Sequence, residues 1–273
     1  MPELPEVETV VRDLRPLLIG RSFAKIVVSR KALRRKWSRS WHAQLLGQRV
    51  EEIERRGKWI RIDLGDPWLL VHLGMTGQFT VVGKSPRETH THFVFMLDDG
   101  NELRFRDVRR FGSVSYYPNR AELDAFFVQS ALGPEPFDLD PAYWRHRLKS
   151  AKRNLKAILL DQTTVAGVGN IYADESLFEA RLHPTILGQR ITAEQAERLR
   201  HAIVAVLTRA IEQRGSSIRD YIGGSGLKGK MQDEFCVYGR TGEPCLRCRS
   251  AIEKITLAGR STHFCPRCQR KRK

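Results

Sequence analysis

Apolar positions near the start of the chain recur at three- and four-residue steps, which predicts an amphipathic helix over residues 2–19. The apolar stripe consists of Val7, Val10, Val11, Leu14, Leu17 and Leu18. Two prolines, Pro2 and Pro5, lie where a helix start tolerates them, and Gly20 provides a natural end.

From residue 22 to residue 117 the pattern changes to short alternating or β-branched runs, which predict strands. These runs lie at 23–28, 49–54, 59–64, 68–73, 92–97, 102–106 and 113–117. Asp98–Asn101 reads Asp-Asp-Gly-Asn, a sequence typical of a hairpin turn. Several short strands separated by turns predict a β-sandwich, with the first helix packed against it.

The pattern changes again at Leu132–Pro136, where we place a domain boundary. From residue 141 to residue 222 the periodicity is helical, with helices expected near 154–161, 171–180 and 192–213. The last of these begins with Thr192 and Gln195, the spacing of a capping box. The predicted fold class is α+β, in three parts: 1–131, a helix and a β-sandwich; 132–230, a helical domain; and 231–273, a short segment that contains all five cysteines.

The composition is that of a globular protein, with 41% hydrophobic and 29% charged residues in a chain of 273. The formal net charge of +16 favours a polyanionic partner such as DNA, although a merely basic, well-solvated surface remains an alternative. The longest apolar runs are too short to span a bilayer, and glutamates occupy the place of a signal peptide's basic residues. We therefore expect a cytoplasmic protein with no membrane partner.

Four of the five cysteines form two Cys-x-x-Cys pairs, Cys245 with Cys248 and Cys265 with Cys268. Two such pairs separated by a hairpin-length spacer can complete a tetrahedral Zn²⁺ site, and four thiolates leave no open coordination position. We expect one structural zinc, which so short a segment needs in order to fold. Four unliganded thiols are the alternative. Cys236 is expected to be a small core side chain.

Pro2 follows the initiator methionine, and removal of Met1 would expose a secondary amine with a pKa of about 8. Such an amine can attack a sugar C1′ and form an iminium, and Glu3 beside it can move protons. The alternative is an ordinary helix start, in which proline and acidic residues are favoured for structural reasons. These residues by themselves leave both interpretations open.

The opening Pro2–Thr9 and the terminal four-cysteine finger resemble the formamidopyrimidine-DNA glycosylase family, over essentially the whole chain. The opening is similar to this branch rather than to the endonuclease VIII branch, which tends to begin Pro-Glu-Gly-Pro. Further matching segments, in the family's order, are Gly57-Lys58, His72–Gly77, Asp107–Gly112, Leu132–Pro136, Gly167–Ala173 and Val237–Arg240.

The resemblance implies roles for individual residues. Pro2 would be the nucleophile, Glu3 the general acid/base, Glu6 a structural and proton-relay carboxylate, and Lys58 a lysine near the lesion and its phosphate. A plain helix-start acid remains an equal alternative for Glu6. The implied DNA contacts are His72, Met75, Arg109, Arg110, Phe111, Lys156, Asn170, Tyr238 and Arg260. Within this set Met75, Arg109 and Phe111 would fill the gap left by an everted base. Lys156, Asn170, Tyr238 and Arg260 would grip phosphates around a helix–two-turn–helix motif, with Arg260 near the finger tip.

Two segments depart from the family's pattern. Gly224–Lys230 superficially approaches a phosphate-binding loop, but Met231 replaces the required Ser or Thr and no strand precedes it, so nucleotide hydrolysis is rejected. The segment aligns instead with the family's lid over the lesion, and Lys230-Met231 stands where aromatic residues are common. Val108 replaces the usual proline before Arg109.

The resemblance implies a monomeric DNA glycosylase and abasic-site lyase of base-excision repair in a bacterial cytoplasm. It would excise 8-oxoguanine and formamidopyrimidines from duplex DNA through a Schiff base on Pro2, followed by β- and δ-elimination. One alternative is a relative that acts mainly on oxidised pyrimidines or pre-formed abasic sites. Another is a non-catalytic, zinc-containing DNA-binding protein.

Overall fold

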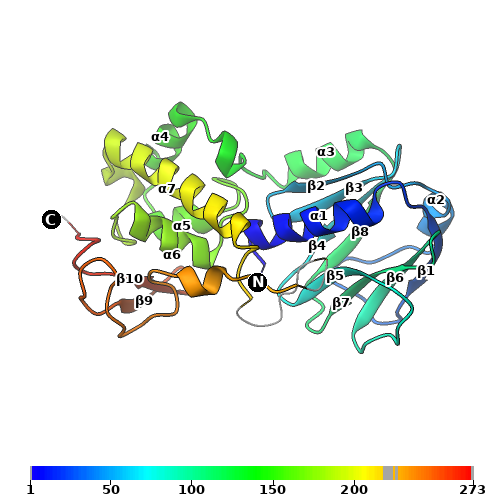
Figure 1. Cartoon of the computed structure of the whole chain (residues 1–273). Helices are drawn as coiled ribbons and strands as arrows, with labels where there is room; N and C mark the ends of the chain where they lie inside the picture. Colours follow the sequence, from blue (N-terminus) through cyan, green and yellow to red (C-terminus); the bar gives the residue numbers. More distant parts are fainter. Residues whose placement is uncertain (1, 218–223, 225–226, 272–273) are drawn as a thin grey trace. The chain divides into compact units, whose positions relative to one another are not determined.

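The computed structural model describes residues 2–217, 224 and 227–271 (Figure 1). The chain forms two compact units. Unit 1 comprises Met1–Ser130 and Gln213–Lys230, and unit 2 comprises Ala131–Glu212 and Met231–Lys273. The division into parts 1–131, 132–230 and 231–273 stays a prediction.

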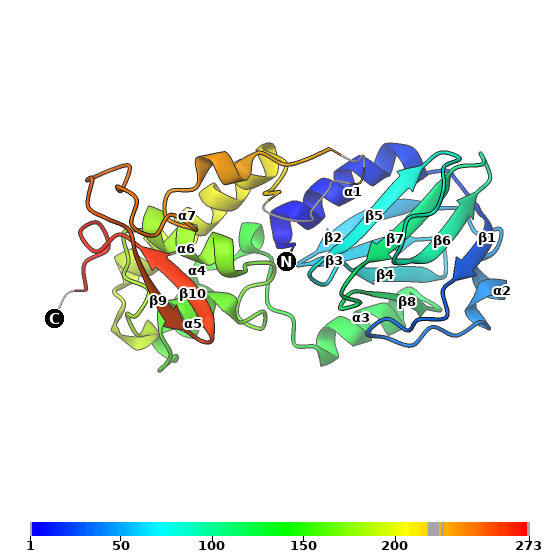
Figure 2. The same cartoon turned by 90° about the horizontal axis from the view of Figure 1, so that it is seen from below.

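Unit 1 contains a β-sandwich of two antiparallel four-stranded sheets, as the alternating pattern predicted (Figures 1 and 2). One sheet has the order β1 (Phe23–Val28), β6 (Thr91–Leu97), β7 (Glu102–Asp107) and β5 (Gly77–Val82). The other has the order β2 (Glu52–Arg56), β3 (Trp59–Asp63), β4 (Trp68–His72) and β8 (Ser113–Tyr117). The hairpin at Asp98–Asn101 is confirmed, because Leu97 donates its N–H to the carbonyl of Asn101.

Helix α1 (Leu4–Leu18) packs against β2 and β5, each the edge strand of its own sheet. It thereby covers two edges that would otherwise expose unpaired backbone groups. Its stripe Val7, Val10, Val11, Leu14 and Leu18 is fully buried in the sandwich core. Leu17 was wrongly assigned to this stripe: it is 38% exposed, because Leu18 takes the inward position of the last turn.

Two further helices of unit 1 lie outside the predicted pattern. The short α2 (Trp41–Leu45) follows a basic loop. Helix α3 (Arg120–Gln129) contacts β8, and its Leu123 packs against Trp68 and Leu70 of β4. The sheet β2-β3-β4-β8 therefore has apolar contacts on both faces.

Unit 2 is built around α6, whose residues 171–178 are all buried. The helices are α4 (Pro141–Lys149), α5 (Leu155–Leu160), α6 (Asn170–Glu179) and α7 (Ala193–Glu212). The 3₁₀ turn η1 (Pro136–Asp138) precedes α4, η2 (Gly188–Arg190) lies between α6 and α7, and η3 (Met231–Glu234) follows α7. Strands β9 (Glu253–Leu257) and β10 (Arg260–Phe264) form an antiparallel hairpin, and β10 contacts α6. The predicted capping box is confirmed: Gln195 donates its N–H to Oγ1 of Thr192 at 3.1 Å.

Across the described ranges, no helix combines the length and the apolar character needed to cross a membrane.

Candidate nucleic-acid interface and metal centre

Pro2, Glu3 and Glu6 lie buried at the start of α1, with Glu3 as its N-cap. Glu3 donates its backbone N–H to Oε2 of Glu6 at 2.8 Å. The other oxygen of Glu6 accepts bonds from the N–H and the hydroxyl of Ser216, at 2.8 and 3.1 Å. Glu6 therefore does more than stabilise a helix start: its carboxylate joins the residue beside Pro2 to a segment 210 positions further along the chain.

Ser216 precedes the predicted lid, Gly224–Lys230, by eight positions. Lys230 donates its N–H to the carbonyl of Gln213 at 2.9 Å, and Gly229 donates its N–H to the hydroxyl of Ser217 at 2.8 Å. Arg214 forms an ion pair with Asp13 of α1 at 2.7 Å. Residues 213–217, which precede the predicted lid, are thus joined to α1 and to the end of the lid, whereas residues 225 and 226 of the lid lie outside the described residues.

Lys58 lies in a two-residue turn between β2 and β3, whose flanking residues Arg56 and Trp59 are paired. Gly57, the first turn residue, has φ +56°, a conformation that glycine adopts without strain. Lys58 is only 7% exposed, so the turn holds its ammonium group close to the protein surface rather than extended into solvent.

His72 ends β4 next to the β3 residue Trp59. Burial lowers the pKa of His72 to about 4, and the positive charges of Lys58, Arg34 and Arg35 add to this effect. The imidazole is therefore neutral at pH 7. Its Nδ1 accepts the N–H of Gly74 at 3.0 Å, which places the ring proton on Nε2. A neutral donor among three cations suits an anionic group such as a phosphate.

The sequence patterns did not single out Arg34 and Arg35. A detectable signal existed, because residues 30–39 include six lysines and arginines and no acidic residue. The Arg35 guanidinium lies 4.5 Å from the ring centre of Phe126 and donates to the hydroxyl of Tyr117 at 3.1 Å. Arg34 donates its backbone N–H to the carbonyl of Gly112 at 3.3 Å. The basic loop is thus connected to the segment predicted to fill the gap in DNA.

That segment presents Arg109, Arg110 and Phe111, all exposed, with the Phe111 side chain 46% accessible. The guanidinium of Arg109 lies 4.6 Å from the centre of the Phe111 ring. Met75, which is partly exposed, comes from a second loop that abuts the first. A Cβ added to Gly74 would lie 2.4 Å from the backbone nitrogen of Gly112. The structure therefore brings the predicted trio together on two interlocked loops.

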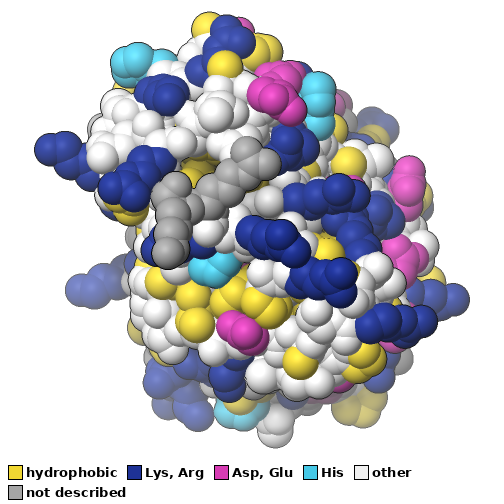
Figure 3. Space-filling model, turned by 90° about the vertical axis from the view of Figure 1, so that its left-hand side faces the viewer, with side chains coloured by type: hydrophobic (Ala, Val, Ile, Leu, Met, Phe, Trp, Pro, Cys, Tyr) yellow, Lys and Arg dark blue, Asp and Glu magenta, His cyan; other side chains and the backbone are white. Residues whose placement is uncertain are grey.

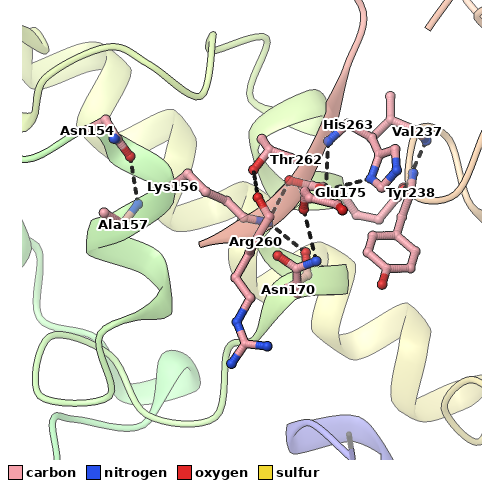
Figure 4. A network of polar contacts seen from close by, with 12 residues as sticks. Asn154, Lys156, Ala157, Asn170, Glu175, Val237, Tyr238, Arg260, Thr262 and His263 are labelled. Carbon is pink, nitrogen blue, oxygen red and sulfur yellow. Dashed lines mark hydrogen bonds and ion pairs between the residues drawn. The ribbon is translucent and has the colours of Figure 1, made fainter. Parts of the chain in front are cut away.

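The predicted phosphate-gripping residues of unit 2 surround a buried ionic network on α6 (Figure 4). Lys156 is fully buried, and its ammonium group lies 2.6 Å from Asp174 and 2.8 Å from the carbonyl of Asn170. The second oxygen of Asp174 accepts from the backbone N–H of His263 at 2.9 Å and lies 3.1 Å from Nδ1 of the same residue. The structure thus gives Lys156 an internal partner, while its contact with phosphate stays a prediction.

The neighbouring carboxylate, Glu175, fastens a second segment to α6. It accepts the backbone N–H groups of Cys236, Val237 and Tyr238 at 2.8–2.9 Å. Burial raises the pKa of Glu175, and these three bonds act in the opposite direction. Two consecutive acidic residues therefore bind two separate stretches of chain to one helix.

Asn170, Tyr238 and Arg260 stand around this network (Figure 4). Asn170 is the first residue of α6 and donates its side-chain amide to the carbonyl of Ser261 at 3.0 Å. Arg260 is exposed and opens β10 directly after the finger turn, as its spacing predicted. Backbone N–H groups at a helix N-terminus attract anions, so the three side chains and the start of α6 form a candidate phosphate site.

The four cysteines Cys245, Cys248, Cys265 and Cys268 converge at the base of the β9–β10 hairpin. Their sulfur atoms all lie within 4.8 Å of one another. Tetrahedral zinc with Zn–S bonds of about 2.3 Å requires sulfur atoms roughly 3.8 Å apart. The Cys245–Cys268 and Cys248–Cys265 separations are 3.9 and 3.4 Å, so the sulfur atoms fit one ion.

Cys236 lies apart from this cluster and packs against the buried side chains of the finger. Burial raises the pKa of its thiol to about 11, as expected for a packing residue rather than a reactive one.

Lys and Arg side chains are prominent on the face drawn in Figure 3, whereas acidic side chains are few. This distribution agrees with the excess of 47 lysines and arginines over 31 acidic residues. A surface of this kind attracts a polyanion through sequence-independent phosphate contacts.

Three family models match the chain in succession. The formamidopyrimidine-DNA glycosylase N-terminal domain matches residues 1–114, and the H2TH domain of the same glycosylase matches residues 132–221. A zinc finger found in FPG and IleRS matches residues 242–270. The finger match and the four-sulfur geometry together confirm the prediction of one zinc.

Curated relatives match over nearly their whole length. The formamidopyrimidine-DNA glycosylase of Geobacillus kaustophilus is 44% identical over 275 residues, covering 99% of this chain and 100% of the relative. The enzyme of the same name from Streptococcus pneumoniae strain R6 is 43% identical, with the same coverage.

Solved structures show the same fold bound to DNA. The Lactococcus lactis FPG mutant G226P in complex with a Fapy-dG-containing DNA matches with a TM-score of 0.92 and 38% identity, covering 99% of this chain and 100% of that one. A complex of Lactococcus lactis Fpg with an abasic-site-containing DNA matches with the same score and identity, covering 98% and 100%.

Proposed function

Because the chain belongs to the formamidopyrimidine-DNA glycosylase family, we propose that it excises oxidised purines from duplex DNA and then cleaves the strand at the abasic site. The substrates are 8-oxoguanine and formamidopyrimidines. The observation that carries the proposal is the buried group of Pro2, Glu3 and Glu6 at the start of α1, where Glu6 holds the N–H beside Pro2.

After removal of Met1, the Pro2 amine attacks C1′ of the damaged nucleotide. The bond from C1′ to the base breaks, and Glu3 supplies a proton to the opening sugar ring. The resulting iminium acidifies C2′, so loss of a C2′ proton expels the 3′ phosphate. A second elimination expels the 5′ phosphate and leaves a gap of one nucleotide. Lys58 and the neutral His72 bind the phosphate beside the reacting sugar.

The exposed trio Met75, Arg109 and Phe111 replaces the everted nucleotide. Removing a base from the stack costs a few kcal/mol, which apolar side chains inserted in the gap help to offset. The Arg109 guanidinium pairs with the orphaned base. Asn170, Tyr238 and Arg260 bind backbone phosphates through unit 2, and the protein acts as a monomer.

Borohydride trapping tests the proposal, because reduction of the iminium links the protein covalently to its DNA. The purified protein is incubated with duplexes carrying 8-oxoguanine opposite cytosine, an oxidised pyrimidine, or an abasic site. We expect trapping on the first duplex and on the abasic one. Pro2→Gly is expected to retain DNA binding and to lose excision of 8-oxoguanine.

Mass spectrometry must first show that Met1 is absent, since a retained methionine converts the amine into an unreactive amide. Trapping confined to the pyrimidine or abasic duplex would support the Schiff-base reaction but not the preference for oxidised purines. It would favour the second candidate, a relative that acts on oxidised pyrimidines or abasic sites. The departure at Lys230-Met231 is the feature that favours this candidate. No trapping on any duplex would leave a DNA-binding protein without this activity, and normal excision by Pro2→Gly would remove Pro2 from the mechanism.

A further inference from the structure

Asp107 is a fully buried carboxylate at the end of β7, directly before the loop that carries Arg109 and Phe111. Its Oδ2 accepts the backbone N–H of Gly112 at 2.7 Å, and its Oδ1 accepts the N–H of Arg109 at 3.2 Å. The two oxygens therefore bind the five-residue loop Val108–Gly112 near its start and at its end.

The same carboxylate holds the second loop of the trio. The hydroxyl of Thr76, the residue after Met75, donates to Oδ1 of Asp107. The Arg109 N–H also lies 3.1 Å from the Thr76 hydroxyl oxygen. One buried side chain thus links the segment that carries Met75 to the segment that carries Arg109 and Phe111.

The backbone of Asp107 is fixed from the opposite side. Its carbonyl lies 3.0 Å from Nε2 of the buried His92, and Nδ1 of His92 lies 3.0 Å from the hydroxyl of Ser29. Ser29 opens the basic loop that precedes α2. Among the described residues no lysine or arginine forms an ion pair with Asp107, so the surrounding hydrogen bonds stabilise its position.

The loop needs such an anchor. Arg110 has φ +57°, a left-handed conformation that a side chain with a Cβ disfavours. Val108 and Phe111 are 44% and 46% exposed, so burial of these apolar side chains does little to hold the loop. Contacts of the backbone with Asp107 fix a conformation that the loop's own side chains do not favour.

We propose that Asp107 is the positioning residue of the gap-filling trio, holding Met75, Arg109 and Phe111 in one arrangement before DNA binds. This inference rests on the proposed function. Asp107 touches neither the sugar nor the base, and it acts only through the two loops. Its effect is therefore confined to substrates from which a nucleotide must be everted out of a duplex.

Two substrates separate this role from a general structural one. Excision of 8-oxoguanine opposite cytosine requires the trio to fill the vacated space. An abasic site in a single-stranded oligonucleotide offers its sugar directly, with no opposite base and no stack to replace. Displacement of a positioned group by about 1 Å can lower a rate by roughly 100-fold.

Asp107→Asn is expected to lower the single-turnover rate of 8-oxoguanine excision from duplex DNA about 10- to 100-fold, because an amide nitrogen replaces one acceptor oxygen. Borohydride trapping on the single-stranded abasic oligonucleotide is expected to stay within about twofold of wild type. Thr76→Val removes only the link between the two loops, and a smaller loss of roughly 3- to 10-fold on the duplex is expected. This second variant decides the test if Asp107→Asn does not fold.

Asp98→Asn is the matched control. Asp98 also accepts a backbone N–H, from Ser22 at 3.1 Å, but in the hairpin at the other end of β7, so both activities should match wild type. The variant that decides the test is Asp107→Asn, or Thr76→Val if the first does not fold. Equal losses of excision from the duplex and of trapping on the single strand in that variant would overturn the inference. An unchanged rate of excision from the duplex would also overturn it. If wild-type protein trapped on neither substrate, the proposed function itself would fail, a result distinct from any effect of Asp107.

Discussion

Asp107 in unit 1 and Asp174 in unit 2 both connect distant segments of the chain, but they bind different kinds of hydrogen-bond donor. Both carboxylates are almost completely buried, and both bind segments that are distant in sequence. Asp107 receives only neutral donors, a hydroxyl and two backbone N–H groups. Asp174 receives the ammonium group of a fully buried lysine, Lys156, and two nitrogens of His263.

The difference reflects how much apolar core surrounds each site. Asp107 lies at the rim of a sandwich whose two sheets and α1 share an extensive buried core. The zinc finger has a small apolar cluster around Cys245 and Cys265, and it depends on metal, ion pairs and hydrogen bonds to remain on α6. We therefore expect the finger and its attachment to α6 to respond far more strongly than the sandwich to the loss of a single charged partner.

Removal of zinc should give the largest effect. Structural zinc contributes on the order of 10 kcal/mol to the folding of a small finger, so chelation is expected to unfold residues 242–270 and to release His263 and Tyr238 from α6. DNA affinity, measured by fluorescence anisotropy, should fall more than about 100-fold, while the circular dichroism of the sandwich persists. Cys236→Ser is the control and should keep one zinc per chain. Undiminished DNA affinity after complete metal loss would show that the finger does not position these residues.

Replacing Lys156 should have the next largest effect. Lys156→Met leaves the buried Asp174 without its cation, and loss of about 3–5 kcal/mol in the free energy of unfolding is expected. The double variant Lys156→Met/Asp174→Leu removes both charges and should recover most of this loss. Urea unfolding measures both variants, with the exposed Lys152→Met as a control that changes charge alone. If Lys156→Met is no less stable than the double variant, the ion pair between Lys156 and Asp174 is not what holds the finger on α6.

The smallest effect concerns His72 in unit 1. Its pKa is about 4 in the folded protein and about 6.5 in the unfolded chain, so the unfolded chain binds the proton first as the pH falls. The contribution of His72 to the free energy of unfolding is therefore constant above pH 6.5, and it decreases as the pH falls from 6.5 to 4. It amounts to at most about 3 kcal/mol, and to roughly 1–2 after allowance for partial exposure.

His72→Asn keeps an acceptor for the Gly74 N–H but does not titrate. Its free energy of unfolding should therefore vary less than that of wild type between pH 6.5 and 4. Urea unfolding at several pH values, without DNA, checks this expectation. Parallel pH profiles for the two proteins would place the burial of His72 in doubt.

The sequence predicted much of the fold because the helix and most strands of unit 1 bury regular stripes. It missed β5, whose apolar side chains Phe79, Val81 and Val82 form only a short pattern directly after a loop motif. It also missed α3, in which Leu123 is the one fully buried side chain and no continuous stripe exists. Where tertiary contacts rather than periodicity hold an element, the pattern carries little information.

The candidate site shows the same limit. Motifs located Lys58, the trio and the cysteines, because those residue types stand at distinctive spacings. They did not reveal Asp107 or Asp174 as anchors, because the partners are backbone N–H groups or side chains up to 89 positions away. Nor did they indicate that Lys156 is buried beside Asp174. The sequence alone does not distinguish a lysine that faces solvent from one that pairs with a buried carboxylate.

The adjacency of Asp174 and Glu175 on α6 also has a consequence for protein synthesis. Their backbone partners are translated much later than Lys156: Cys236 follows Glu175 by 61 residues, and His263 follows Asp174 by 89. At roughly 5–20 residues per second, a ribosome needs about 4–18 s to supply the second of these partners. Glu175 lacks its backbone donors until residues 236–238 are made, and until His263 is made Asp174 can pair only with the earlier Lys156. The central helix of unit 2 therefore reaches its final environment only as the last residues of the finger are made.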